Sequence, residues 1–389
     1  MAAMICFAVL LFKIQLSFGI EVIELLFYSW ETQKDLNAQR DAHAIIKAAF
    51  SSRSAYERLA YMTDAFGPRL SGSTALELAL NWTKEEILND GLYVQEEPVK
   101  VPYWVRGSEY ATLRSPRIKN VRIAGLGGSI GTPNGKPLVA KVLVVSSFDE
   151  LESMKSEVEG RIVVYNEEYK GYSTTLEYRL TGAQRAEKYG AVAALVRSVC
   201  PFGLQTVHTG SSNTASIPTA AITKEDAQMF SRMQARGQDI EIELYMEAHT
   251  LPDQMSRNLI VEIKGEKEPE EVIVLGGHMD SWDIADGAMD DGAGAYVCWE
   301  CEHGVPCGSL KTLDPRIGDY ANNPCLGYSN PPYPEPDSML NAYFWYHHTE
   351  ADSIDKLSPE QLQHCAAALA VWTFSIANLQ SLLPRFNNY

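Results

Sequence analysis

Apolar and polar positions change their spacing along the chain, and the change divides it into stretches of different character. Between residues 42 and 92, apolar positions recur at the interval of an α-helix. The cluster GPRLSGS at 67–73 interrupts this pattern with glycine and proline, which predicts a tight loop between helices. After residue 102, short runs rich in β-branched residues follow, at 141–146 and 161–165. With a helical stretch at 181–189 between such runs, the middle of the chain is expected to form a compact β-rich module with one or two helices.

The pattern after residue 252 is typical of an α/β protein. The runs NLIVEI at 258–263 and VIVLG at 272–276 are joined by a short polar segment, which predicts a hairpin that leads into a buried strand. Residues 359–383 carry apolar side chains on roughly one helical face and predict a C-terminal helix. Residues 301–341 are rich in proline and show no sustained periodicity, so no regular element is expected there.

Composition places the chain among ordinary globular proteins. It has 389 residues, 46% of them hydrophobic and 21% charged, which suits about two domains. The formal net charge is −17, and such an acidic chain is not expected to bind nucleic acid, because phosphate neutralisation requires a basic face. The seven cysteines neither demand nor forbid disulfides.

The first residues resemble a secretory leader. Residues 4–12 form an apolar run of the right length for the core of a signal peptide, and Ser17 and Gly19 are small residues at a plausible cleavage point. We therefore expect a signal peptide at residues 1–19 and a secreted and/or lysosomal protein, with the ER and Golgi as further compartments. The tripeptide that starts at Asn81 is an N-glycosylation sequon. No later stretch is apolar for long enough to predict a membrane anchor.

Histidines and carboxylates gather at three places in the second half of the chain. His278 and Asp280 directly follow the run at 272–276, and two residues apart they would share one face of a strand end. Asp290 opens a glycine-flanked acidic turn that leads into a helix near Ala293, and His348 belongs to a polar cluster near the C-terminus. Neutral imidazole and carboxylate are good zinc ligands, and a carboxylate can bridge two metals.

Three other kinds of site are considered from the residues. GGSIG at 127–131 fits the nucleophile elbow of serine hydrolases, but that motif requires a helix directly after Ser129, and a turn follows instead. The same glycines miss the spacing of a dinucleotide-binding loop. A zinc ribbon would rest on Cys298, Cys301, Cys307 and Cys325, whose second half lacks ribbon spacing.

Nine motifs in order along the chain resemble the superfamily of di-zinc aminopeptidases and carboxypeptidases. They are YERL at 56–59, GPRLSGS at 67–73, GLGGSIGTP at 125–133, SFDEL at 147–151, VVYN at 163–166, HMDSWD at 278–283, GAMDDG at 287–292, GVP at 304–306 and HH at 347–348. The resemblance runs almost unbroken from about residue 42 to residue 300 and resumes in the C-terminal part.

The resemblance implies a fold and a set of roles. It implies an α/β di-zinc aminopeptidase-like domain, at residues 42–106 and 251–389, with an inserted β-rich protease-associated domain at 107–250. His278 would ligate one zinc ion, His348 the other, and Asp290 would bridge both, while Asp280 would orient His278. It further implies two Zn²⁺ ions, a small unblocked peptide or dipeptide as substrate, a metal-activated water as nucleophile and a homodimer.

The chain departs from this family at one junction. The family has about a hundred residues between the helix after the Asp-Asp-Gly turn and the GVP segment, and they supply a Glu-Glu pair and an Asp ligand. Here three residues separate Glu300 from Gly304. A catalytic segment is therefore expected to be missing between 300 and 304, so the peptidase domain is truncated, zinc binding weak and turnover slow or absent. The alternative is a catalytically inactive isoform or remnant that acts as a binding or assembly module.

Overall fold

The computed structural model describes residues 33–201, 203–267, 269, 271–297 and 346–378. Its α-helices are α3 (Gln33–Ser51), α4 (Ser54–Phe66), α5 (Thr74–Asn89), α6 (Phe148–Ser153), α7 (Tyr172–Glu187), α8 (Lys224–Ala235), α9 (Ala293–Val297) and α13 (Pro359–Ala377). Its strands are β1 (Val94–Val105), β2 (Glu109–Ser115), β3 (Lys119–Val121), β4 (Ile123–Gly125), β5 (Leu138–Val145), β6 (Ile162–Tyr165), β7 (Ala193–Arg197), β8 (Thr219–Ile222), β9 (Glu241–Met246) and β10 (His249–Val261). The structure is therefore mixed α/β.

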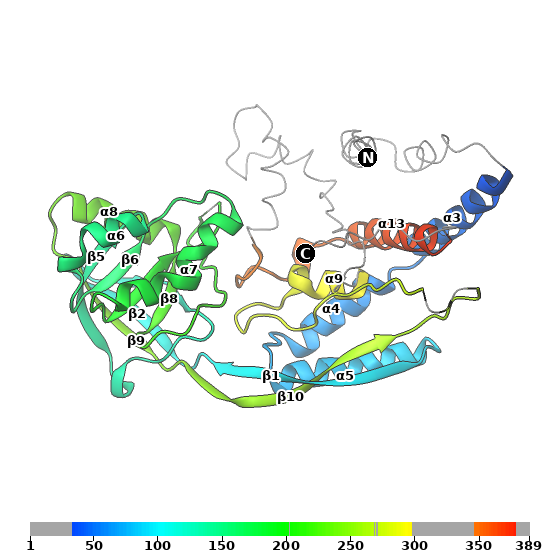
Figure 1. Cartoon of the computed structure of the whole chain (residues 1–389), viewed down its shortest axis with the longest axis horizontal. Helices are drawn as coiled ribbons and strands as arrows, with labels where there is room; N and C mark the ends of the chain where they lie inside the picture. The colour runs from blue at the N-terminus through cyan, green and yellow to red at the C-terminus, as the bar shows by residue number, and fades with distance from the viewer. Residues whose placement is uncertain (1–32, 202, 268, 270, 298–345, 379–389) are drawn as a thin grey trace.

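Eight of the strands form one mixed sheet between Glu109 and Met246. The strand order is β3-β2-β9-β5-β6-β7-β8-β4, with β5, β6, β7 and β8 parallel and the other neighbours antiparallel. Figure 1 shows this module in green at one end of the molecule, with α6, α7 and α8 packed around the sheet. We call it the sheet module. It contains three α-helices, where the sequence predicted one or two.

Helices cover both faces of the sheet because the parallel strands carry apolar side chains on both faces. Val142 and Val144 on β5 join a core with Phe230 of α8, whereas Leu143 and Val145 join a second core with Ala183 of α7. Successive side chains of a strand point to opposite faces, so a continuous apolar run such as β5 requires a helix layer on each side. The sequence runs at 141–146 and 161–165 are accordingly confirmed as buried strands.

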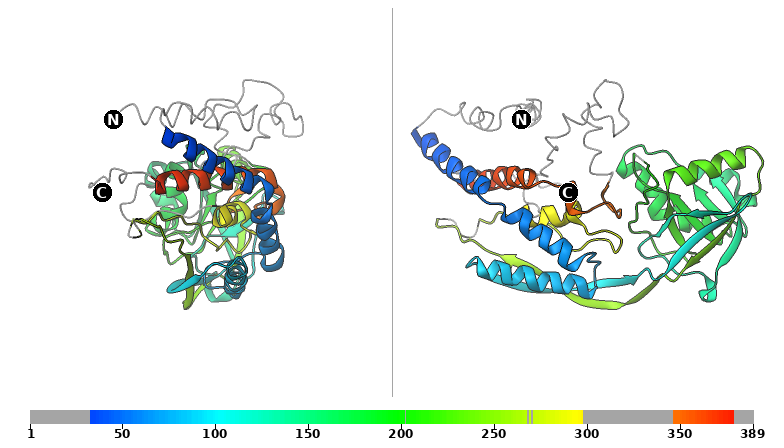
Figure 2. Two further views of the ribbon diagram at one scale, coloured as in Figure 1. Left: turned by 90° about the vertical axis from the view of Figure 1, so that its right-hand side faces the viewer. Right: turned by 180° about the vertical axis from the view of Figure 1, so that it is seen from behind.

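A long two-stranded ribbon leads from the sheet module to a group of helices. Strands β1 and β10 pair antiparallel over their length, and α5 packs against them through Leu76 and Leu80, which contact Val94 and Leu259. Figures 1 and 2 show α5 along this ribbon and α3, α4, α9 and α13 above it, at the end of the molecule away from the sheet module. We call these helices, with the loops before α9 and α13, the helical half. Its core is formed by Leu59, Met62, Ala79 and Leu362.

Several helices begin where the sequence supplies a cap. The Ser73 side chain accepts a hydrogen bond from the Leu76 N–H at the start of α5, which ends the predicted loop at 67–73. Ser358 and Gln361 form a reciprocal capping box before α13, and Pro359 occupies its first turn. Such caps satisfy backbone N–H groups that have no partner within the helix. The helical patterns at 42–92 and 359–383 are confirmed within the described residues.

The predicted hairpin and buried strand near residue 272 are wrong. The run at 258–263 lies largely in β10, which pairs with β1 and not with 272–276. Residues 272–276 form no strand, and Val272 is 60% and Val274 44% exposed. An apolar run becomes a strand only when neighbouring strands satisfy its backbone groups. No described strand lies beside this run.

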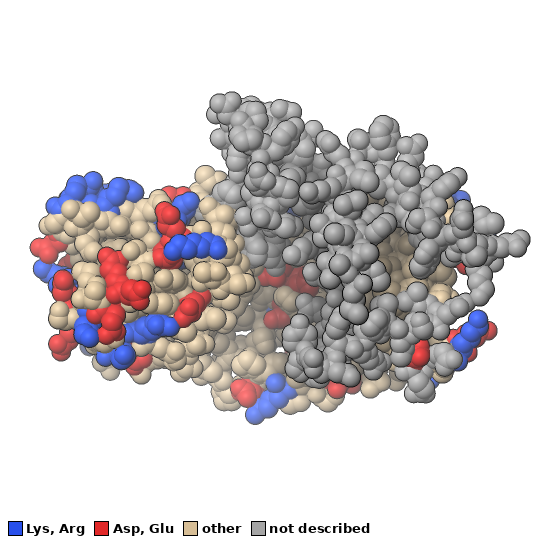
Figure 3. All heavy atoms as spheres, turned by 45° about the horizontal axis from the view of Figure 1, so that its top comes forward, with Lys and Arg blue, Asp and Glu red and all other residues tan. Residues whose placement is uncertain are grey.

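Other sequence-based expectations fall outside the described residues. These are the signal peptide at 1–19, the junction at 300–304, the four cysteines of the ribbon hypothesis and the proline-rich stretch. Among the described helices, none is long and apolar enough to cross a membrane. On the face of the sheet module seen in Figure 3, basic and acidic side chains are interspersed, so that face offers no continuous basic surface.

The interior strand β7 provides a test of the packing. Leu195 is fully buried and lies between Val164 of β6 and Ala220 of β8. Replacing Leu195 with Ala should lower the free energy of unfolding by about 2–5 kcal/mol, because the substitution removes buried methyl groups and leaves a cavity. Urea unfolding followed by circular dichroism measures this loss. Leu204→Ala, at a side chain that is 81% exposed, is the control and should change stability by less than about 0.5 kcal/mol. Equal stability of the two variants would contradict the described core.

Candidate metal centre

The three residues with metal-ligand chemistry converge, although they lie up to 70 positions apart in the sequence. His278 Nε2 lies 3.6 Å from Asp290 Oδ1, and His348 Nε2 lies 3.0 Å from Asp290 Oδ2. One carboxylate therefore faces a different imidazole with each of its oxygens. The side chains of Asp290 and His348 are mostly buried, at 12% and 16% exposure, while that of His278 is 48% exposed.

Both imidazoles turn their other nitrogen toward an oxygen. His278 Nδ1 lies 3.2 Å from Asp280 Oδ1 and 2.9 Å from the Asp280 carbonyl oxygen. His348 Nδ1 lies 3.2 Å from the carbonyl oxygen of Thr209. An Nδ1–H that donates to these oxygens leaves the Nε2 lone pair directed at Asp290. Two lone pairs that face a carboxylate require positive charge between them, supplied by a proton or by a cation.

The pKa of His278 reflects this surrounding. Burial lowers it, but the hydrogen bonds to Asp280 and Asp290 outweigh burial and raise the pKa above its ordinary value. By contrast, burial lowers the pKa of His347 to about 2, with a further decrease from the neighbouring His348. A histidine pKa raised by two neighbouring carboxylates, beside a histidine pKa lowered by burial, is typical of functional sites.

A buried arginine fixes the loop that runs from His278 to Asp290. Arg69 is fully buried, and its guanidinium donates to the backbone carbonyl oxygens of Met279, Asp286 and Gly287 as well as to that of Gly67. Its backbone N–H also donates to Ser281 Oγ at 2.9 Å. Burial lowers the pKa of Arg69, opposed by the nearby charges that include Asp286. Sequence reasoning quoted this arginine within a motif but gave it no role.

Asp352 holds the backbone of the acidic turn. Its carboxylate accepts hydrogen bonds from the N–H groups of Met289 at 2.6 Å and Asp290 at 3.0 Å. It is 1% exposed, and burial raises its pKa to about 7, although these two hydrogen bonds act in the opposite direction. These two hydrogen bonds fix the backbone that leads to the Asp290 side chain. The position of Asp352 four residues after His348 was the available signal in the sequence, and the sequence-based reasoning did not use it.

The sheet module reaches into this centre. Thr209 donates its N–H to the His348 carbonyl oxygen at 2.9 Å and accepts from His348 Nδ1, so a loop of the module positions this histidine from two sides. Arg106 donates to both oxygens of Asp283, at 2.6 and 2.7 Å, and to Thr209 Oγ1 at 3.2 Å. Burial acts to lower the pKa of Arg106, but the hydrogen bonds and charges of Asp283 and Glu109 together raise it above its ordinary value. Neither Thr209 nor Arg106 was expected from the sequence.

The donor set fits zinc in type and spacing. A zinc ion bound to an imidazole nitrogen and a carboxylate oxygen holds these atoms about 3.4 Å apart at a tetrahedral angle. The two N–O separations here, 3.0 and 3.6 Å, bracket that value. However, no group of three or more such side chains among the described residues could hold one metal ion. A zinc ion at either oxygen of Asp290 would therefore have two described ligands, that oxygen and one imidazole nitrogen. A catalytic zinc site normally has three protein ligands.

The remaining candidate residues lie elsewhere. Ser129 is 3% exposed, accepts from the Thr219 N–H and donates to the Ile130 carbonyl oxygen, and a 3₁₀ turn at Pro133–Gly135 follows it in place of the helix that a nucleophile elbow needs. This serine is a structural group. Asn81 is exposed on α5, where its side-chain oxygen accepts a hydrogen bond from Arg257.

Comparison with known sequences identifies relatives over most of the chain. The model of peptidase family M28 matches residues 258–306. Carboxypeptidase Q of Homo sapiens is 49% identical over 267 residues, which cover 67% of this chain and 56% of that protein. The chain thus matches only about half the length of this relative. Carboxypeptidase Q of Xenopus laevis is 36% identical over 434 aligned positions, 90% of this chain and 92% of that protein. Since this chain has 389 residues, part of the aligned Xenopus sequence has no counterpart here.

Solved structures agree with this relationship. The fold is similar to an M28 peptidase precursor from Shewanella amazonensis, with a TM-score of 0.77, 26% identity and coverage of 90% of this chain and 99% of that one. It is also similar to a zinc aminopeptidase from Bacillus subtilis, with a TM-score of 0.51, 16% identity and coverage of 82% and 94% of the two chains. The second likeness concerns the fold alone. The aminopeptidase-like fold expected from the sequence is confirmed.

The role of Arg69 can be tested by replacing it with methionine. We expect Arg69→Met to lower the free energy of unfolding by about 3 kcal/mol or more, because it leaves several buried carbonyl oxygens without donors. Urea unfolding measures the change. Arg114→Met, at an arginine that is 48% exposed and forms an ion pair with Glu243, is the matched control and should cost less than about 1 kcal/mol. A stable Arg69→Met protein would show that these carbonyl contacts do not hold the loops.

Proposed function

The chain belongs to the carboxypeptidase Q family within peptidase family M28, and we propose on this basis that it carries a zinc peptidase site for small unblocked peptides. Because the chain matches only about half the length of several of these relatives, its own activity is part of the proposal. The observation that carries the proposal is the position of Asp290, whose two oxygens face His278 Nε2 and His348 Nε2.

Each residue has a role in this proposal. His278 and His348 would each hold one zinc ion, and Asp290 would bridge the two. Bound zinc supplies an activated water and stabilises the negative charge that develops on the peptide carbonyl oxygen. Asp280 keeps the His278 proton on Nδ1 and thereby leaves Nε2 as the ligand atom, and the Thr209 carbonyl oxygen does the same for His348.

The proposed chemistry is impaired in this chain. The Glu-Glu pair and the Asp ligand that the family places between residues 300 and 304 are absent from the sequence at that junction. We therefore propose weak zinc binding and slow hydrolysis. The exposed run at 272–276 supports a truncated peptidase domain, since neighbouring strands would bury it. The competing function is that of a catalytically inactive remnant that binds or assembles through the intact sheet module.

Further parts of the proposal rest on the resemblance and on sequence features. They are the division into a peptidase domain at 42–106 and 251–389 and a protease-associated insert at 107–250, routing through the secretory pathway after removal of residues 1–19, glycosylation at Asn81, and a homodimer. The continuous sheet between Glu109 and Met246 supports the division.

Zinc binding tests the assignment of Asp290. The unmodified chain should bind zinc with low affinity, and Asp290→Asn should abolish binding because it weakens the carboxylate that would bridge the two ions. Asp280→Asn should weaken binding by about 10–100-fold, as expected when the group that orients a ligand is lost. Isothermal titration calorimetry with zinc measures both effects. Asp253→Asn is the control, since Asp253 is an exposed β10 residue that pairs with Lys100. Unchanged binding by Asp290→Asn would refute this assignment.

Hydrolysis of an unblocked dipeptide tests the impairment. We expect a rate at least about 10²–10⁴-fold below that of human carboxypeptidase Q, since a general base alone contributes that factor. The measurement is release of free amino acid at equal enzyme and zinc concentrations, with and without a chelator. A comparable rate that a chelator removes would overturn the impairment. A folded chain with neither zinc nor hydrolysis would instead support the remnant.

A further inference from the structure

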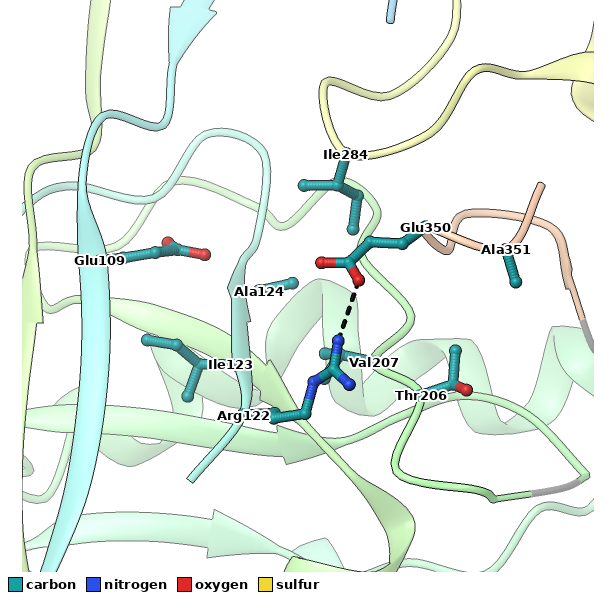
Figure 4. A pocket seen from close by; sticks show the side chains of 9 residues that line it. All are labelled: Glu109, Arg122, Ile123, Ala124, Thr206, Val207, Ile284, Glu350 and Ala351. Atoms are coloured by element: carbon teal, nitrogen blue, oxygen red, sulfur yellow. Dashed lines mark hydrogen bonds and ion pairs between the residues drawn. The ribbon is translucent and has the colours of Figure 1, made fainter. Parts of the chain in front are cut away.

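A pocket lies beside the candidate metal centre, between the sheet module and the helical half. Its volume is about 470 Å³, a size that suits a small organic ligand. The residues that line it are Glu109, Arg122, Ile123, Ala124, Thr206, Val207, Ile284, Glu350 and Ala351. Figure 4 shows the Glu350 carboxylate extending across the pocket to the Arg122 guanidinium. The pocket therefore contains both charged groups and aliphatic side chains.

Chain connectivity places the pocket next to the metal centre. Glu350 follows His348 by two residues, and Val207 precedes Thr209, which holds His348, by two residues. Ile284 belongs to the loop that Arg106 ties to the sheet module through Asp283. A ligand in this pocket would contact the segments that carry one proposed zinc ligand and the residue that orients it.

The charges of the pocket differ in how firmly they are held. Glu109 is mostly buried and accepts from the Gly125 N–H and from Arg106, so its carboxylate is already satisfied. Arg122 is 54% exposed, and its partner Glu350, at 2.9 Å, is 67% exposed. An exposed ion pair of this kind contributes only about 0–1 kcal/mol, because water screens it. Another carboxylate can therefore replace Glu350 on Arg122 at little cost.

We propose that this pocket binds the free carboxylate end of a short peptide or amino acid, with Arg122 as the cation that recognises it. A guanidinium binds a carboxylate through two parallel N–H donors, which also fixes the orientation of the ligand. Ile123, Val207 and Ile284 provide an aliphatic wall for the side chain of the terminal residue. Glu350 occupies Arg122 in the absence of ligand and competes with it. The role in a peptidase rests on the proposed function, whereas binding itself does not.

Calorimetric titration with N-acetyl-L-leucine and with its amide tests the proposal on the full chain after removal of metal by dialysis. The two probes differ only in the terminal carboxylate. We expect the acid to bind at least about 10-fold more tightly than the amide. Arg122→Gln should abolish this preference, and Glu350→Gln should strengthen binding of the acid several-fold because the competing carboxylate is removed. Arg114→Gln, at another exposed arginine of the sheet module, should behave as the unmodified chain.

The outcomes separate this proposal from the zinc proposal. Equal binding of the acid and the amide to the unmodified chain, or a preference that survives in Arg122→Gln, would overturn the pocket assignment. Zinc titration of Arg122→Gln should match the unmodified chain, because Arg122 has no contact with the proposed ligands in the described structure. If the acid is preferred but zinc does not bind, the zinc proposal fails and the carboxylate pocket stands.

Discussion

The buried guanidinium of Arg69 is the contact on which the candidate site depends. It joins its own loop at 67–73 to the loop between His278 and Asp290, and it satisfies carbonyl oxygens in both of them. A charge without solvent requires strong hydrogen-bond partners, and backbone carbonyls that point to one centre satisfy that need. The arrangement is therefore mutual: the cation is tolerated because the loops surround it, and the loops keep their conformation because the cation is there.

The geometry at Asp290 follows from this contact and from Asp352. Arg69 holds the chain at Asp286 and Gly287, just before the acidic turn, and the Asp352 carboxylate holds the N–H groups of Met289 and Asp290. The Asp290 side chain then has little freedom, so its two oxygens face two different histidines. Preorganisation of this kind lowers the entropy cost of binding an ion, which matters most where ligands are few.

The sheet module and the helical half contribute unequally to this centre. The module has apolar cores on both faces of its sheet, and it supplies Thr209, which contacts Arg106 and His348 across the boundary. The helical half carries the three candidate ligands but leaves the run at 272–276 exposed. The candidate ligands thus keep their positions although no described strand lies at 272–276, because Arg69 holds the loop before Asp290 and Thr209 of the module holds His348.

Local sequence determined much of this protein. Helical and strand runs were predictable from the spacing of their apolar residues. A helix that buries one face repeats apolar residues every three to four positions, and a strand repeats them at alternate positions or as a short continuous run. His278 and Asp280 were expected to share one face of a strand end, but residues 272–276 form no strand, and the two side chains meet within a loop instead. Asp290 and His348 were assigned by resemblance to a family and not by spacing, because nothing local indicates that they meet.

Tertiary structure alone decided the rest. The partner of β10 is β1, about 150 residues earlier, and an apolar run carries no information about which distant strand will satisfy its backbone groups. The same applies to residues 272–276, which have the composition of a buried strand and lack a described neighbour. The contacts of Arg69 and Thr209 are made to backbone carbonyls, which every residue possesses. Their specificity comes from position in space, and only the folded chain creates it.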